Sequence, residues 1–112
     1  MLFAQEQPLR AFIDSYLSAW HQASPHQGCP LPTMSAELGQ RGQPSATTDT
    51  VLNARLEQVA ATLDGADQAQ RSLMIMSTLV GALMLSRSVE NPELGVRILE
   101  TVREGLKTQE QV

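Results

Sequence analysis

The side chains with the most reactive chemistry in this sequence are His21, His26 and Cys29, which lie close together in the chain. Imidazole and thiolate are the ligands that zinc prefers, and a thiolate with a lowered pKa can also sense oxidants. However, a structural zinc site needs four ligands, and this group offers three. No Lys or Arg lies near Cys29 in the sequence to lower the pKa of its thiol. We therefore predict neither a metal nor another cofactor.

Carboxylates are the other candidates for catalysis. Asp14, Glu37 and Glu57 show no spacing that pairs them on one face of a helix. The sequence also has no glycine-rich phosphate loop, no His-Glu-x-x-His zinc motif and no Gly-x-Ser-x-Gly nucleophile elbow. We expect a protein that is not an enzyme.

Aromatic side chains are more promising for binding. Phe12, Tyr16 and Trp20 follow one another at intervals of four and therefore share a helix face. They could form part of a pocket wall for a small apolar or aromatic effector, or they could simply pack in the core. Met34, Met74 and Met76 could form an adaptable wall of the pocket or simply fill gaps in the core. Glu37 could face a cationic effector or solvent. The candidate ligand-binding residues are Phe12, Tyr16, Trp20, Met34, Glu37, Leu56 and Met74.

The hydrophobic periodicity that positions these residues is helical throughout. Pro8 suits a first helical turn, and Ser24-Pro25 suits a helix end. No segment alternates with the period of two that a strand requires. We predict an all-α fold, an antiparallel bundle of about five helices in a single domain over residues 1–112. The expected helices span about 8–24, 32–41, 46–63, 67–88 and 92–107.

Three helix starts have specific signals. Thr47, Thr48 and Asp49 offer side-chain acceptors to the third helix. Asp67 and Gln70 resemble a capping box at the start of the fourth helix. Asn91-Pro92-Glu93 combines a capping residue, a first-turn proline and an acid at the start of the last helix.

The fourth helix is unusual because residues 72–86 carry no charge and are apolar nearly all the way round. A helix of a small globular protein normally has one apolar stripe and one solvated face. The run is too short and too interrupted by Ser77 and Thr78 to span a bilayer, which requires about 20 apolar residues. We therefore expect its own chain to cover one side and a second copy the other. The candidate residues of the interface and bundle core are Leu73, Met76, Val80, Gly81, Met84, Leu94, Ile98, Leu99, Val102 and Leu106.

Glycines within the last two helices could allow helices to approach closely. Gly81 lies in the fourth helix, and Gly95 and Gly105 lie in the fifth. A glycine inside a helix costs about 0.5–1 kcal/mol relative to alanine, and a close helix contact could offset that cost.

The overall composition fits a globular protein, with 42% hydrophobic and 18% charged residues. The net charge is -4 and the basic residues are scattered, so this chain by itself should not grip a phosphate backbone. A single cysteine fits a reducing compartment, and no export leader is evident, so we expect a cytoplasmic location and no membrane partner.

An ordered set of short motifs resembles one family. These are Gly28-Cys29-Pro30-Leu31, Ala36-Glu37-Leu38, the run 79–87, and Asn91-Pro92-Glu93-Leu94 followed by Ile98-Leu99 and Arg103. From about Leu9 to Lys107 the chain resembles the C-terminal regulatory domain of TetR/AcrR-family transcriptional regulators, and the Gly-Cys-Pro segment resembles the LmrA-like subgroup.

This resemblance implies a homodimer whose last two helices form a four-helix bundle with those of the partner. It also implies a pocket for a small effector and an N-terminal helix-turn-helix domain that binds operator DNA. No helix-turn-helix pattern precedes Leu9, so operator DNA would be bound only through a domain absent from this chain. The predicted function is ligand sensing and homodimerisation for a TetR-family repressor. The alternative is a stand-alone helical dimerisation module that binds no small molecule and pairs with a full-length relative.

Overall fold

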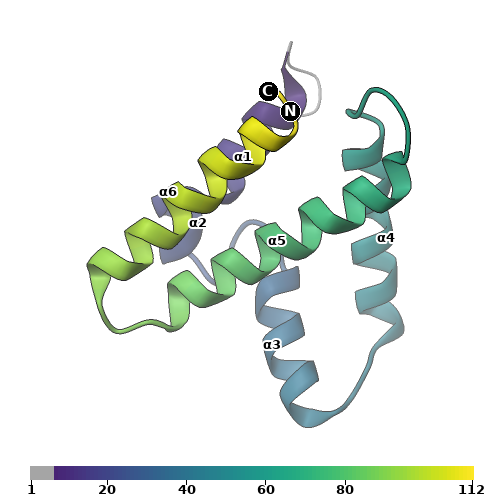
Figure 1. Ribbon diagram of the computed structural model, residues 1–112. Helices are drawn as coiled ribbons and strands as arrows, with labels where there is room; N and C mark the ends of the chain where they lie inside the picture. The colour runs from purple at the N-terminus through teal and green to yellow at the C-terminus, as the bar shows by residue number, and fades with distance from the viewer. Residues whose placement is uncertain (1–6) are drawn as a thin grey trace.

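The computed structural model describes residues 7–112 and shows an all-helical chain, which confirms the predicted fold class (Figure 1). No strand occurs within that span. The first six residues of the predicted domain lie outside the described part. The helices are α1 (Pro8–Tyr16), α2 (Ala19–Ala23), α3 (Leu31–Arg41), α4 (Ala46–Ala60), α5 (Gln68–Ser88) and α6 (Pro92–Gln109).

The segment expected as one helix over 8–24 is broken into α1 and α2, so this prediction was wrong. The break occurs at Leu17 and Ser18. Ser18 has extended backbone angles, and its hydroxyl accepts a hydrogen bond from the His21 N–H at 3.1 Å, which starts a new helix. The Leu17 carbonyl, freed by the break, accepts a hydrogen bond from the Arg103 Nη1 of α6 at 3.1 Å. The hydrophobic periodicity of residues 8–24 could not show this break, because the side chain that satisfies the freed carbonyl comes from a distant part of the chain.

Two other helix starts differ from expectation. At α4 the capping residue is Ser45, whose Oγ accepts from the backbone N–H groups of Thr47 and Thr48. At α5 the predicted capping box does not form, because Asp67 adopts the left-handed conformation (φ 59°) and its side chain makes no capping bond. The side chain of Gln68 instead donates to the Leu63 carbonyl, tying the start of α5 back to the turn that follows α4.

The start of α6 agrees with its sequence signal. The Asn91 side chain accepts hydrogen bonds from the backbone N–H groups of Glu93 and Leu94, at 2.9 and 3.4 Å. Pro92 occupies the first helical turn, and Glu93 places a negative charge near the positive end of the helix dipole.

The central element of the molecule is α5, which contacts all five of the other described helices (Figure 1). By length and composition α5 could also cross a bilayer. Its buried face, however, packs inside the chain, as expected of a core helix. That face consists of Ser72, Ile75, Met76, Leu79, Ala82, Leu83 and Ser86.

Candidate functional site

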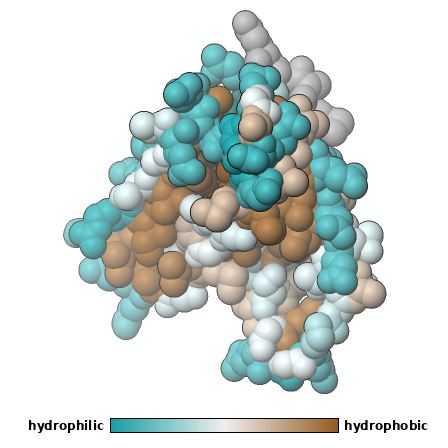
Figure 2. Space-filling model, turned by 45° about the vertical axis from the view of Figure 1, so that its right-hand side comes forward, coloured by the Kyte–Doolittle hydropathy of each residue, from teal (hydrophilic) through white to brown (hydrophobic). Residues whose placement is uncertain are grey.

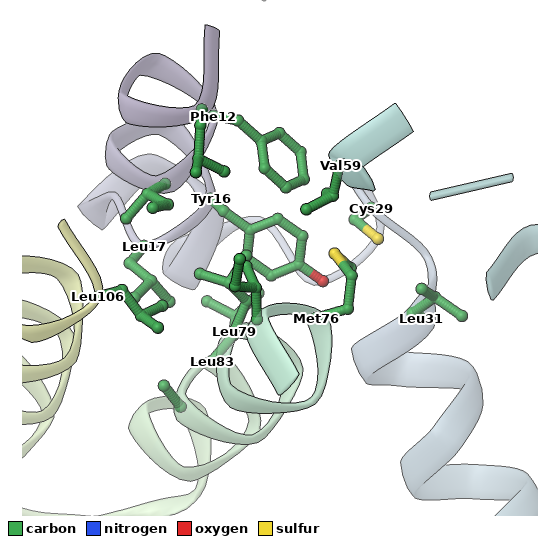
Figure 3. Close-up of a cluster of buried hydrophobic side chains, with 14 of the residues drawn as sticks. Phe12, Tyr16, Leu17, Cys29, Leu31, Val59, Met76, Leu79, Leu83 and Leu106 are labelled. Carbon is green, nitrogen blue, oxygen red and sulfur yellow. The ribbon is translucent and has the colours of Figure 1, made fainter. Parts of the chain in front are cut away.

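The two buried aromatic residues of the predicted ligand-binding set lie in the core and not at the wall of an open pocket. Phe12 and Tyr16 meet edge to face with ring centroids 5.5 Å apart, and both side chains are buried. Figure 3 shows the Tyr16 ring reaching from α1 across Leu79 toward Cys29 and Met76. Burial raises the pKa of the Tyr16 phenol, with Cys29 acting in the same direction. Leu56 is partly buried against the same cluster.

The remaining members of that set are scattered over the surface. Trp20 is 58% exposed and Met74 is 64% exposed. Glu37 is exposed on α3 and pairs with Arg41 one helical turn later, at 2.9 Å. Met34 is half-buried on α3. The structure thus does not bring the seven predicted residues into one pocket, because the break after Tyr16 removes Trp20 from the buried face of α1.

His21 joins three segments through both nitrogens of its buried ring. Nδ1 lies 2.7 Å from the Tyr16 carbonyl oxygen, and Nε2 accepts the Cys29 backbone N–H at 3.2 Å. Because Nε2 is an acceptor, the neutral ring carries its proton on Nδ1. Burial lowers the pKa of His21, and the nearby charge of Arg87 lowers it further. The ring is therefore engaged in holding the backbone, and neither nitrogen is free to bind a metal.

Gly28 explains why a glycine precedes Cys29. Its φ is +74°, in the left-handed region, and a Cβ at this position would lie 2.7 Å from Cδ2 of His21. Only glycine fits both the backbone conformation and the close approach of the ring. The Gly-Cys-Pro segment thus packs against the His21 ring and holds it in place. The spacing of histidine and cysteine in the sequence did not reveal this role.

Sequence reasoning also missed the connection between α2 and the end of α5. Arg87 donates from Nε to the Gln22 carbonyl at 3.1 Å and from Nη2 to the His21 carbonyl. In return, the Gln22 side chain donates to the Ser86 carbonyl at 2.9 Å. These bonds satisfy carbonyls at both helix ends and fix the short α2 on the body of the domain.

A long groove runs between α5 and α6, with a volume of about 530 Å³. Its α5 side contains small residues, and Gly81 has no atom within 4 Å of the position that a Cβ would take. Leu85 at its rim is 59% exposed. Figure 2 shows hydrophobic surface on the face of the molecule that these helices form. The α5–α6 groove is lined by Ser77, Thr78, Gly81, Ala82, Leu85, Leu94, Arg97, Ile98, Thr101 and Val102.

A second hollow lies between α3, α4 and α5 and has a volume of about 310 Å³. None of its lining residues is charged. One of them, Thr48, has a buried hydroxyl oxygen without a hydrogen-bond partner. The α3–α4–α5 cavity is lined by Leu31, Ser35, Thr48, Leu52, Met76, Ser77, Val80, Gly81 and Met84.

The ten residues predicted for the interface and bundle core separate into four groups. Met76, Leu99 and Leu106 are buried within the chain itself. Leu94, Ile98 and Val102 line the α5–α6 groove. Val80 and Met84, together with the buried Met76, line the α3–α4–α5 cavity, and Gly81 lines both hollows. Leu73 is exposed.

Comparison with known protein families gives a match over most of the chain. A sequence model of the family described as "Tetracyclin repressor-like, C-terminal domain" matches residues 6–109. No curated protein and no solved structure matches the chain.

Proposed function

The chain belongs to the family of tetracyclin repressor-like C-terminal domains, and from this premise we propose that it senses a ligand and forms homodimers for a cytoplasmic transcriptional repressor. The assignment to the LmrA-like subgroup remains a prediction from the Gly-Cys-Pro segment. Operator DNA would be bound by an N-terminal helix-turn-helix domain, whose position the pairing of two copies would set.

The observation that carries the proposal is the uncovered apolar face of α5. Met74, Thr78, Gly81 and Leu85 recur at helical spacing on the side opposite the buried face. The leucine and the methionine are both more than half exposed, and the intervening residues open onto the α5–α6 groove. Contiguous apolar surface that a small globular protein leaves exposed commonly marks the contact surface of a partner.

A second copy fits this face better than a smaller occupant. The groove extends along two long helices, so two copies related by a two-fold axis can pack α5 and α6 against their equivalents in four-helix geometry. Gly81 leaves room for a side chain of the partner, since no atom of its own chain occupies that space. Obligate interfaces of this kind bury about 2,000 Å² or more.

Regulation would follow from a shift in population. An effector that binds one dimer geometry more tightly than another favours that geometry by its differential affinity. The attached DNA-binding domains would then move toward or away from the spacing of their two half-sites.

A reporter assay tests pairing and output together. The chain is fused to a helix-turn-helix domain that binds its operator only as a dimer. We expect the fusion to repress the reporter, and Leu85→Glu to abolish repression because it places a charge in the interface. Ala54→Glu on the exposed side of α4 is the matched control and should still repress. A stable, well-expressed wild-type fusion that does not repress would contradict the proposal.

A further inference from the structure

We infer that the α3–α4–α5 cavity is the effector site of this domain and that it selects uncharged, mainly apolar molecules with one hydrogen-bonding group facing Thr48. This inference rests on the proposed sensing function, and it specifies the site and the class of ligand. The cavity volume of about 310 Å³ lies at the lower end of the range for small-molecule sites, about 300–1,000 Å³.

The absence of charge in the lining determines the ligand class. The walls are formed by Leu31, Leu52, Val80 and the two methionines, with only hydroxyl groups as polar atoms among the lining side chains. A charged ligand would lose its hydration here without gaining an opposite charge, which is costly. The structure therefore favours a neutral ligand, in contrast to the cationic effector that Glu37 could have faced.

Thr48 supplies the polar contact. Two other helical threonines satisfy their hydroxyls within their own helix: Thr50 donates to the Ala46 carbonyl and Thr78 to the Met74 carbonyl. The equivalent acceptor for Thr48 would be the carbonyl four positions earlier, at Pro44. Thr48 lies in the first turn of α4, however, so Pro44 precedes the helix. Its buried Oγ1 has no partner. A threonine in a helix has two accessible χ1 rotamers, so rotation can turn this hydroxyl toward a carbonyl or hydroxyl of the ligand.

The position of the cavity connects it to the dimer face. Ser77 and Gly81 line both the cavity and the α5–α6 groove, so at this point only small residues of α5 separate the two hollows. A ligand in the cavity would touch the same residues that a second copy contacts from the other side. Ligand binding and dimer geometry would thus be coupled through one turn of α5.

The methionines provide built-in reporters for a test by nuclear magnetic resonance with ¹³C-methyl labels. Met76 and Met84 line the cavity, whereas Met34 and Met74 lie outside its lining. The probes are three naphthalenes of similar size: 2-naphthol, neutral 2-methylnaphthalene and anionic 2-naphthoate. We expect saturable shifts of the Met76 and Met84 methyl signals with the two neutral compounds and none with the naphthoate. Equal shifts of all four methyl groups, no saturable shift, or equal affinity for the anion would overturn the inference.

Two pairs of variants test the residues. Thr48→Val keeps the side-chain shape and removes the hydroxyl, so it should weaken 2-naphthol binding about twofold to tenfold and leave 2-methylnaphthalene binding unchanged. Ser35→Leu should block the cavity from α3, and the neighbouring Ala36→Leu, outside the cavity, should not. Equal losses for both naphthalenes, or for both leucine variants, would contradict the assignment. Sedimentation of the same samples distinguishes the proposals, because a dimer without methyl shifts refutes only the cavity, and a monomer with them refutes only the pairing.

Discussion

At the scale of single residues, histidine, cysteine and tryptophan serve purposes that composition alone does not reveal. His21 and Cys29 suggest metal or redox chemistry by type, yet the structure shows the imidazole bridging the Tyr16 carbonyl and the Cys29 backbone N–H. The thiol lies in the core near the Tyr16 ring (Figure 3). Gly28, directly before this cysteine, was the sequence signal that could have indicated close packing against the imidazole and not the binding of a metal.

The buried, neutral His21 should make stability depend on pH. Its pKa in the folded chain is lowered by burial, so between that value and the ordinary value of about 6.5 the unfolded chain binds more protons. The stabilisation is complete above the ordinary pKa and is lost as the pH falls toward the folded pKa. We expect the urea concentration at the unfolding midpoint to decrease as the pH is lowered from about 7.5 to about 5.5. His21→Gln should flatten this dependence, and His26→Gln, at an exposed position, should retain it.

Trp20 should contribute little to the stability of the fold. The residue is 58% exposed, and its ring stacks on that of His21 with centroids 6.3 Å apart. Trp20→Ala should therefore cost less than about 1.5 kcal/mol, whereas Leu17→Ala at the fully buried neighbouring position should cost about 2–5 kcal/mol. Chemical unfolding of both variants measures the difference. A similar cost at the two positions would show that the aromatic ring is buried in solution.

At the scale of elements, the helices were largely predictable because apolar spacing, prolines and glycines determine most of their bounds locally. Pro92 and the cap at Asn91 are examples of such local signals. The break at Ser18 was not predictable, because Arg103 of α6 satisfies the freed carbonyl from far along the chain. The α3–α4–α5 cavity was equally hidden, since its residues come from three helices and no pattern within one helix marks them.

Close packing of helices occurs at Gly95 and not within the chain at Gly81. A Cβ at Gly95 would lie 3.1 Å from the Gln22 side chain and 3.3 Å from the Ser86 carbonyl, a backbone group that yields less readily than a side chain. Gly95→Ala should thus destabilise the fold by about 1–3 kcal/mol. Gly105→Ala meets no atom within 4 Å and should stabilise α6 by about 0.5–1 kcal/mol. Thermal unfolding of the two variants should shift in opposite directions, and shifts of the same sign would contradict the packing at Gly95.

At the scale of the whole molecule, the apolar character of α5 has two separate explanations. One face is the core of the chain itself, where Ile75, Met76, Leu79 and Leu83 are fully buried. The opposite face carries Met74 and Leu85 in solvent and opens onto the α5–α6 groove. The sequence indicated that both sides of this helix needed to be covered. Only the fold shows which residues pack inside the chain and which lie on the exposed face.

Sedimentation equilibrium of the wild-type chain over a wide range of concentration tests the central claim most directly. If a second copy covers the exposed face of α5, the mass should be twice the 12.2 kDa of one chain, and Leu85→Glu should reduce it to a single chain. A folded wild-type protein that keeps the mass of one chain at the highest concentration would contradict the account.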